Sequence, residues 1–525
     1  QDKQFFIEQA VIAKEAKITK HRNSKKFYDP RKRSWIWRHS LAIKVIYAFS
    51  IHTFMLINLA VFLRCSSDSV SEEESVTYFD VTIKVEGLGR VTPEAGVFLK
   101  NSLILFKAIP LDGYYFDHWL GFDNQVESYE HEFLLTRNLI LTAVFLPIPE
   151  LSDEVLVFDP KNIDPNPVFM IENGGKSAYL NTKKGERLKT WEFDLNLGND
   201  LKLMPDGSII GIFKPENVSF SFGGYGGILR KYNPEGTLVW EYEVNSKTEL
   251  MHHDFDVLPN GNILILVWEK FSEDRALNLG FSGSGPIYLE KIIELNTESQ
   301  TIVWEWRSAD HLIQDFEQSS SNFGSVTEYP EKIDLNYHEN ENGDLMHANG
   351  LYYDPKRDVI FVSVNFYSEV WVIPHQFDTI KSKTELGDLV FRFGNPNAYG
   401  GSGDRLFFNN HHPSLVTLDP ESIGNFLIYM NGYKNEQSKV YEFLLPTVFD
   451  SNPLNWISPE IIWSYSDPEL FFGKISGAYR LPNGNTLICE GDFGYWEVTH
   501  SGKIVWKFDG GTTFWRGYVY PNFIL

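Results

Sequence analysis

Residues 480–508 read RLPNGNTLICEGDFGYWEVTHSGKIVWKF, and this stretch decides the fold. It opens on a Leu-Pro-Asn-Gly-Asn turn signal, continues with the apolar segment 486–489, and closes on the aromatic–x–aromatic triplet Trp506-Lys507-Phe508. Pro, Asn and Gly favour tight turns, and alternation along a strand puts both aromatic rings of the triplet on one face. The stretch therefore predicts a unit of short strands joined by tight turns.

Both halves of this unit recur along the chain. The turn signal returns at 204–207 and 258–262, and the widest gap between triplets spans 306–391. Repeats of about 40 to 90 residues that hold several short strands indicate a β-propeller with insertions, so six triplets predict six blades. We expect the long insertion loops to lie on the functional face. The first aromatic residues of the six triplets are Trp191, Trp240, Trp304, Phe391, Trp463 and Trp506.

The composition of the 525 residues agrees with an all-β protein. The chain holds 14 Trp, 25 Tyr and 40 Phe, residue types that favour strands. A net charge of −23 argues against nucleic acid as a partner, because phosphates would be repelled. Two cysteines exclude a disulfide scaffold and a cysteine-based zinc ribbon.

The N-terminus, residues 1–64, differs from the rest in charge and hydropathy. It holds 13 Lys and Arg against 4 Asp and Glu, and the apolar run 41–63 is long enough to span a bilayer. Basic residues before such a run predict a cytoplasmic N-terminus and an extracytoplasmic body, in the periplasm or on a bacterial cell surface. Cys65 at the end of the run resembles the lipidated cysteine of a bacterial lipoprotein, and an acidic linker covers 65–75. The alternative is an uncleaved membrane anchor with an incidental cysteine.

Residues 76–147 predict a small β-module. Strand-like alternation at 77–85 is followed by a Gly-Leu-Gly turn at 87–89, and a Pro-Leu-Asp-Gly-Tyr segment begins at Pro110. With Phe116-Asp117-His118-Trp119 and a closing strand at 139–145, the pattern resembles the internalin-type B-repeat of bacterial surface proteins. That resemblance implies a spacer or adhesive module without chemistry of its own.

Three histidine-bearing segments lie beside the repeated units of the predicted propeller, 150–525. They are His252-His253, His347 and His411-His412, each among Asp and Asn residues. Comparable positions in different blades converge on the central channel of a propeller, so these imidazoles predict one site with a nucleophile and an acid. Three imidazoles are also compatible with zinc or copper, although no His-Glu-x-x-His motif occurs. The chain has no Gly-x-Ser-x-Gly elbow and no Walker loop, which argues against a serine hydrolase and against nucleotide use.

These segments carry a family resemblance. The body resembles a bacterial arylsulfate sulfotransferase of the type that is independent of 3′-phosphoadenosine-phosphosulfate, which is a six-bladed propeller. The motifs are His-His-Asp ahead of Leu-Pro-Asn-Gly-Asn at 252–262, Asp-Leu-Met-His-Ala-Asn at 344–349, Val-Ser-Val at 362–364, Asn-His at 410–411 and Ile-Ser-Gly-Ala-Tyr-Arg-Leu-Pro-Asn-Gly-Asn-Thr at 475–486.

The resemblance implies a sulfotransferase that moves a sulfuryl group from an aryl sulfate to a phenol through a sulfohistidine. It implies His411 as the nucleophile, with His412 as the fallback, and His347 with Asn349 as groups that hold the sulfuryl oxygens and assist proton transfer. The earlier histidine of the family maps to His252 or His253. No cofactor and no metal are expected.

One position departs from the family pattern. Asn365 stands where well-studied members place an arginine against the sulfate, which removes a planar bidentate donor. Arg480 or Arg405 are candidates to replace it.

Two other classes of protein remain open from the sequence. A non-enzymatic surface propeller that binds glycans or proteins fits the B-repeat-like module and the tether as well as an enzyme does. A quinone-dependent propeller oxidoreductase fits the fold, but the chain lacks the metal and acid cluster of that class.

Overall fold

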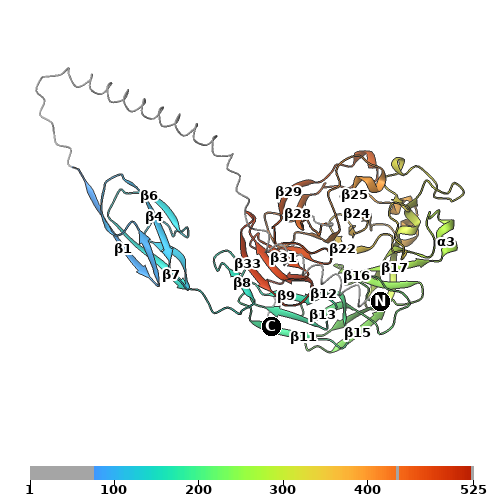
Figure 1. Cartoon of the computed structure of the whole chain (residues 1–525), viewed down its shortest axis with the longest axis horizontal. Coiled ribbons are helices and arrows are strands. Elements are labelled where there is room, and N and C mark those ends of the chain that lie inside the picture. The colour runs from blue at the N-terminus through green and yellow to red at the C-terminus, as the bar shows by residue number, and fades with distance from the viewer. Residues whose placement is uncertain (1–75, 433–436, 522–525) are drawn as a thin grey trace, which may run out of the picture. The chain divides into compact units, whose positions relative to one another are not determined.

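The computed structural model describes residues 76–432 and 437–521, and the chain in this part is nearly all β (Figure 1). The predicted membrane segment, the acidic linker and Cys65 lie outside the described residues. Within the described part, no helix has both the length and the apolar character that a membrane crossing requires.

The first seven strands form two sheets around a small aromatic core. Phe106, Phe116, Trp119 and Phe145 are buried in it, in line with the predicted β-module, whereas its relation to the B-repeat stays a prediction. The four-stranded sheet contains β3 (Gly96–Leu99), β1 (Tyr78–Glu86), β7 (Leu139–Pro147) and β5 (Tyr114–Leu120). The three-stranded sheet contains β2 (Gly89–Thr92), β4 (Leu103–Pro110) and β6 (Glu130–Leu134).

From residue 155 onward the described chain forms six larger sheets, which follow one another in chain order. The first, in spatial order, contains β11 (Arg187–Glu192), β10 (Ser177–Asn181), β9 (Val168–Glu172) and β34 (Phe514–Val519). The second contains β12 (Leu197–Leu203), β13 (Ile209–Phe213), β14 (Ile228–Tyr232) and β15 (Leu238–Glu243). The third contains β16 (Glu249–Val257), β17 (Ile263–Phe271), β18 (Ile287–Asn296) and β19 (Thr301–Arg307).

The remaining three sheets repeat this antiparallel order. The fourth contains β22 (Ala348–Asp354), β23 (Val359–Val364), β24 (Glu369–Pro374) and β25 (Phe391–Phe393). The fifth contains β26 (Asn410–Leu415), β27 (Phe426–Met430), β28 (Lys439–Leu444) and β29 (Glu460–Tyr465). The sixth contains β30 (Gly477–Arg480), β31 (Thr486–Glu490), β32 (Gly494–Val498), β33 (Ile504–Asp509) and β8 (Val155–Phe158).

The turn signals and the aromatic triplets have separate places in these sheets. Each strong turn signal joins the first two strands of a sheet, and its glycine has a positive φ, 84° at Gly261 and 82° at Gly484. The six triplets lie in or directly after β11, β15, β19, β25, β29 and β33, and most of their aromatic rings are buried.

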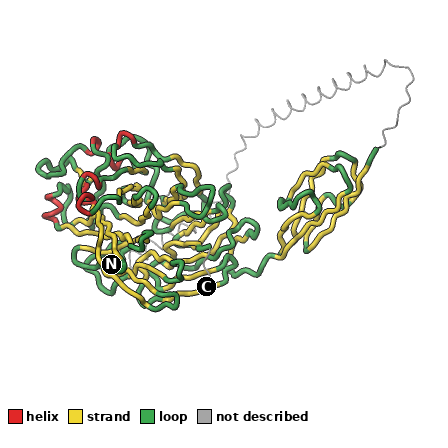
Figure 2. The backbone as a smooth tube through the Cα atoms, turned by 180° about the vertical axis from the view of Figure 1, so that it is seen from behind, coloured by secondary structure: helices red, strands yellow, loops and turns green. Residues whose placement is uncertain are grey.

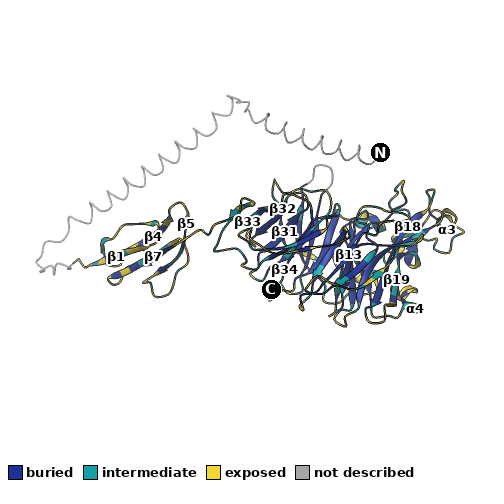
Figure 3. Ribbon diagram, turned by 90° about the horizontal axis from the view of Figure 1, so that it is seen from below, coloured by how far each residue is buried: buried dark blue, intermediate teal, exposed yellow. Residues whose placement is uncertain are grey.

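Apolar side chains fill the space between consecutive sheets. One cluster joins the third and fourth sheets through Trp306 and Trp371, and another joins the sixth sheet to the first through Trp506 and Met170. In Figure 1 the red end of the body lies beside its blue-green beginning, where β34 pairs with β9. Figure 3 shows that strands of the body are largely buried and that exposure is concentrated in the loops. Hydrophobic burial between sheets is therefore the main stabilising interaction.

Helical turns are few and short in the described part. Figure 2 shows them in red, mostly gathered on one side of the body. The α-helices are α3 (Glu273–Asn278) and α4 (Thr379–Ser382). The short parallel pair β20 (Leu312–Ile313) and β21 (Ile333–Asp334) belongs to the same long insertion that the spacing of the triplets indicated.

Candidate active site

In five of the six larger sheets the end strand that carries residues of the candidate site, β12, β16, β22, β26 or β34, has a shift of hydrogen-bond register. Such bulges bend a strand and re-aim its side chains, and they are common beside active sites. Most of the polar residues of the site lie at or beside these shifts. The shifts occur between Leu197 and Leu201 in β12, Met251 and Phe255 in β16, Ala348 and Gly350 in β22, His411 and Ser414 in β26, and Phe514 and Gly517 in β34.

Three of the predicted histidines have left-handed backbone conformations. The φ angle is 50° at His253, 54° at His347 and 54° at His412. Side chains other than glycine adopt this region at a cost of about 1–3 kcal/mol, and such strain concentrates where function requires a particular geometry. The backbone is therefore strained at the same residues that the sequence singled out.

His252 and His253 are buried neighbours whose Nδ1 atoms lie 2.9 Å apart. The ring of His252 stacks on Trp268 at 3.9 Å between centroids, and its Nε2 lies 3.0 Å from a carboxyl oxygen of Glu290. Burial lowers the pKa of both histidines well below the ordinary value, and burial raises the pKa of Glu290 well above its own. Both imidazoles are therefore neutral at pH 7, and burial favours the protonated form of the Glu290 carboxyl.

His347 differs from His252 and His253 because its pKa is raised rather than lowered. Its ring lies 4.7 Å from the ring of His253, between centroids, and stacks on Phe366. Burial opposes its protonation, but the Asp344 carboxylate that binds its Nδ1 outweighs burial, and Glu290 adds to the effect, so the pKa of His347 is raised. His347 thus holds a proton more readily than the neighbouring imidazoles, which suits a general acid.

The tautomer of His411 follows from its partner, Asn431. The Asn431 amide nitrogen donates to the backbone carbonyls of Phe472 and Ile475, at 2.8 Å each, so its oxygen must face His411. That oxygen lies 2.6 Å from Nδ1 of His411 and accepts its proton. Burial lowers the pKa of His411 to about 3, so the ring is neutral and its Nε2 carries an unshared lone pair. This is the state a nucleophilic imidazole needs.

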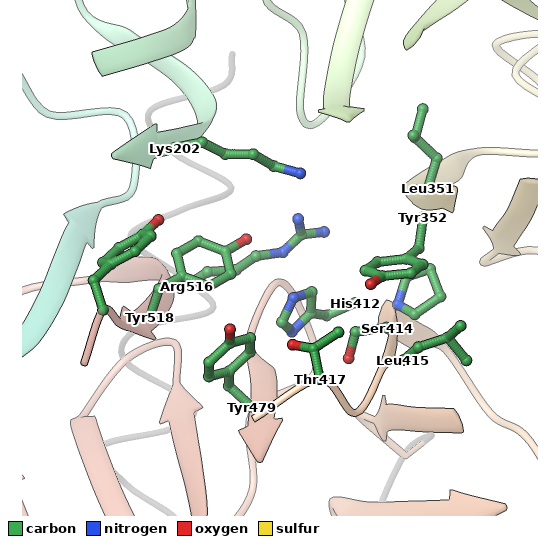
Figure 4. A pocket seen from close by; sticks show the side chains of 12 residues that line it. Lys202, Leu351, Tyr352, His412, Ser414, Leu415, Thr417, Tyr479, Arg516 and Tyr518 are labelled. Atoms are coloured by element: carbon green, nitrogen blue, oxygen red, sulfur yellow. The ribbon is translucent and has the colours of Figure 1, made fainter. Parts of the chain in front are cut away.

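His412 faces a different part of the molecule. Its Nδ1 accepts a hydrogen bond from the backbone N–H of Ala478 at 3.2 Å, and its ring lies 5.8 Å from that of Tyr518, between centroids. The side chain lines a pocket of about 170 Å³ together with Lys202 and Arg516 (Figure 4). The structure therefore separates two histidines that are adjacent in sequence, and His412 does not join the predicted substrate site.

The two predicted asparagines lie near His347 and His411. The Asn349 amide donates to the carbonyl of Asn410 at 2.8 Å, so it holds the backbone that leads into His411. The backbone N–H of Asn365 donates to the carbonyl of His347 at 3.2 Å. Asn349 thus positions the strand that carries His411, and Asn365 is adjacent to His347.

The predicted role of Arg480 is not supported by its position. Its guanidinium forms an ion pair with Glu442, donates to the carbonyl of Gly484 at 2.9 Å and lies over Trp463. These partners belong to the interior of the fifth and sixth sheets. Arg405 donates to the hydroxyl of Ser368, and that hydroxyl donates to the carbonyl of Asn365. Of the two arginines proposed from the sequence, Arg405 is therefore the one linked to Asn365.

The central cation of the site is Arg516, which sequence reasoning missed. It is 2% exposed, lies 2.9 Å from Asp254 and 3.4 Å from Asp200, and donates to the carbonyl of Asn349 at 3.3 Å. Its positive charge opposes protonation of His253 and His411 and so helps to lower the pKa of each ring. No repeated motif covers Phe514-Trp515-Arg516, and an arginine inside an apolar strand is the one signal that could have indicated it.

Taken together, the site combines the neutral ring of His411, the imidazole of His347 with its raised pKa, and the buried Arg516 within one region of converging strands. Glu290, Asp254, Asp344 and Asn431 fix the protonation or orientation of these groups, and the sequence did not predict their roles. Within residues 76–432 and 437–521, no group of three or more His, Cys, Asp or Glu side chains is arranged to hold a metal ion.

The fold and the site define an all-β protein with a buried histidine centre of the kind that group-transfer enzymes use. A sequence model of the arylsulfotransferase (ASST) family matches residues 142–442, and the chain belongs to that family. It is an enzyme of the arylsulfotransferase type. No curated protein matches the chain.

Solved structures similar to the chain are distant. A protein of unknown function from Bacteroides caccae is 12% identical, with a TM-score of 0.39, over 67% of this chain and 98% of that one. A putative 6-phosphogluconolactonase from Bacteroides fragilis is 10% identical, with a TM-score of 0.37, over 69% of this chain and 100% of that one.

Proposed function

We propose that the six larger sheets are the blades of a closed β-propeller. Three observations support the proposal: apolar clusters join consecutive sheets, one cluster joins the sixth sheet to the first, and β34 completes the sheet that β9 begins. Sharing one sheet between the two ends of the chain is a common way to close such a ring, because it leaves no unpaired sheet edge.

The enzyme transfers a sulfuryl group from an aryl sulfate to a phenol, through a sulfohistidine on His411. The observation that carries this is the Asn431 amide, which leaves Nε2 of His411 as the free lone pair. In the first half-reaction Nε2 attacks sulfur, and the bond between sulfur and the phenolic oxygen breaks. The proton of His347 passes to the departing phenolate, so a neutral phenol leaves.

The second half-reaction reverses these steps with a different phenol. Neutral His347 takes the proton of the acceptor hydroxyl, whose oxygen attacks the sulfuryl group on His411. The bond between sulfur and nitrogen breaks, and the lone pair returns to Nε2. Because donor and acceptor use the same groups in turn, the kinetics are ping-pong.

Negative charge on the sulfuryl oxygens is stabilised by donors that the fold holds in place. Arg516 supplies the buried positive charge near the histidines, and protonated His347 supplies a second. Asn365 stands where well-studied arylsulfate sulfotransferases have an arginine, so it offers the sulfuryl oxygens a neutral amide in place of a cation.

The body lies outside the cytoplasm, tethered to a membrane by the run 41–63 or by a lipid on Cys65, with residues 76–147 as a B-repeat-like spacer. The basic residues ahead of the apolar run support this orientation. A reaction between small phenols suits this location, because it requires no cytosolic nucleotide.

The test is incubation with p-nitrophenyl sulfate and phenol, with release of nitrophenolate as the readout. With the donor alone, peptide mass spectrometry should find an adduct of about 80 Da on His411. The adduct should be absent in His411→Ala and present in His412→Ala. An adduct that persists in His411→Ala would move the nucleophile, and a folded protein without turnover or adduct would favour a binding module.

A further inference from the structure

We propose that the pocket around His412 is a second ligand site, separate from the centre around His411, and that it binds a single-ring aromatic oxyanion. Its walls come from the end strands of several sheets: Lys202 lies on β12, Tyr352 on β22, His412 on β26 and Tyr479 on β30. Figure 4 shows these side chains, with Arg516 from β34, directed toward the same space.

Hydrogen-bond donors dominate the polar part of this pocket. Because Nδ1 of His412 accepts from the backbone N–H of Ala478, the proton of this neutral ring is on Nε2, which is left as a donor. Lys202 is bound to Asp256 at 2.5 Å and has further N–H groups to offer. Nε of Arg516 is buried and makes no hydrogen bond within the described part of the chain.

The charges behind these donors are balanced by buried carboxylates. Asp256 pairs with Lys202, and Asp254 pairs with Arg516. Asp200 also contacts Arg516, but burial raises its pKa to about 7, so it is partly protonated at neutral pH. The two carboxylates thus match the two cations, and Asp200 adds partial negative charge, so the pocket has no net positive charge. The preference for an oxyanion rests on the hydrogen-bond donors of His412, Lys202 and Arg516.

Tyrosines supply the apolar part and determine the shape of the ligand. Tyr352, Tyr479, Tyr518 and Tyr520 line the pocket, and the rings of Tyr479 and Tyr518 meet edge to face at 5.6 Å between centroids. A pocket of about 170 Å³ is close in size to apolar cavities of about 150 Å³ that bind one benzene ring. The ligand that fits is one aromatic ring with an anionic group.

The backbone around the pocket is built to accommodate His412. The residue has a φ of 54°, and a Cβ atom on Gly477 would lie 2.6 Å from its Nδ1. A strained histidine and a glycine that makes room for it together indicate a constructed site rather than a packing defect.

His411 does not line this pocket, and the backbone beside the pocket is closely packed at Gly350. A Cβ atom on Gly350 would lie 2.5 Å from a ring carbon of Pro413 and 3.2 Å from Nη2 of Arg516. Arg516 spans the boundary, because it lines the pocket and also donates to the carbonyl of Asn349. The two sites are therefore neighbours that share one wall.

The test is calorimetric titration of the whole protein with benzenesulfonate, whose carbon–sulfur bond prevents sulfuryl transfer. We use His411→Ala as the background, so the result stands whether or not His411 is the nucleophile. Lys202→Met removes a charged donor and should weaken binding about tenfold or more. Ser414→Leu fills the pocket without removing a charge, and should abolish binding even if the lysine variant folds poorly.

The matched control is Lys291→Met. Lys291 is a lysine that also pairs with carboxylates, Glu249 at 2.8 Å and Glu305 at 3.2 Å, and it lines a different pocket. This variant should bind benzenesulfonate as the background does. Absence of saturable binding would overturn the proposal, as would binding that survives both pocket variants but is lost in His347→Ala. If inorganic sulfate bound as tightly as benzenesulfonate, the proposal that the ligand carries an aromatic ring would be wrong.

Discussion

Asn431 holds Nδ1 of His411 at 2.6 Å and gives both of its own amide protons to backbone carbonyls. An amide constrained in this way cannot turn its nitrogen toward the imidazole without losing two hydrogen bonds. The relationship therefore fixes which nitrogen of His411 is free, and it does so without placing a charge beside the ring.

Replacing Asn431 should slow transfer without removing the nucleophile. In Asn431→Ala the ring of His411 loses its orientation, so we expect kcat with p-nitrophenyl sulfate to fall about 10- to 100-fold. In Asn431→Asp a carboxylate would raise the pKa of His411 from about 3. Because the attacking ring must be neutral, the acid limb of the pH–rate profile should move to higher pH. Asn425→Ala, which removes a hydrogen bond to Glu442 on the same sheet, is the control. An unchanged pH–rate profile in Asn431→Asp would contradict the tautomer argument.

Asp344 should control the proton that His347 delivers. The raised pKa of His347 keeps the acid form present at neutral pH, and this form is lost as the pH rises through that pKa. Asp344→Asn removes the carboxylate, so the alkaline limb of the pH–rate profile should move to lower pH. The rate with phenyl sulfate, whose leaving group needs a proton, should fall about 10²–10⁴-fold, and the rate with p-nitrophenyl sulfate should fall less. Equal losses for both donors would argue against a general acid.

Asp254 should be a major contributor to stability. Its carboxylate binds Arg516 at 2.9 Å and accepts from the backbone of Leu351 at 2.9 Å, and all three residues are buried. Because Asp254→Asn leaves a buried cation poorly compensated, we expect the free energy of unfolding in urea to fall by about 3–5 kcal/mol. Asp206→Asn, at an exposed carboxylate near Lys231, should change it by about 0.5 kcal/mol or less. A loss below 1 kcal/mol in Asp254→Asn would show that the pair is dispensable.

His375 should make stability depend on pH above neutrality. Its two ring nitrogens lie 2.9 Å from Asp358 and 2.9 Å from Glu294, so the ring is protonated in the folded state. Burial opposes protonation, but these carboxylates outweigh it and raise the pKa of His375. The stabilisation is complete below the ordinary histidine pKa and is lost as the pH rises through the raised value.

The measurement is urea unfolding between pH 6 and pH 9 for the wild type and for His375→Gln. The wild type should lose roughly 1–3 kcal/mol over this range relative to the variant, whose stability should vary less with pH. Parallel curves for the two proteins would mean that His375 does not titrate in this window.

Much of the architecture could be predicted from sequence because it depends on local chemistry. A Leu-Pro-Asn-Gly-Asn segment such as 258–262 favours a tight turn whatever surrounds it, and an aromatic triplet such as Trp304-Glu305-Trp306 buries two rings on one face of a strand. Repetition of these two signals indicated the succession of sheets, and the histidine segments between them predicted a candidate active site.

The distinction between His411 and His412 was decided by tertiary structure. Simple alternation along a strand predicts that only one of the two faces the site, but it cannot say which. The answer depends on the register shift in β26 and on partners far along the chain, Asn431 for His411 and Ala478 for His412.

The sequence by itself determined the strands, their turns and the candidate histidines, since these follow from propensities and spacing within a few residues. The tertiary structure alone decided the protonation states and the central charge. Those depend on burial and on long-range pairs, such as Arg516 with Asp254 across 262 positions of the chain, and no local pattern encodes the approach of two such residues.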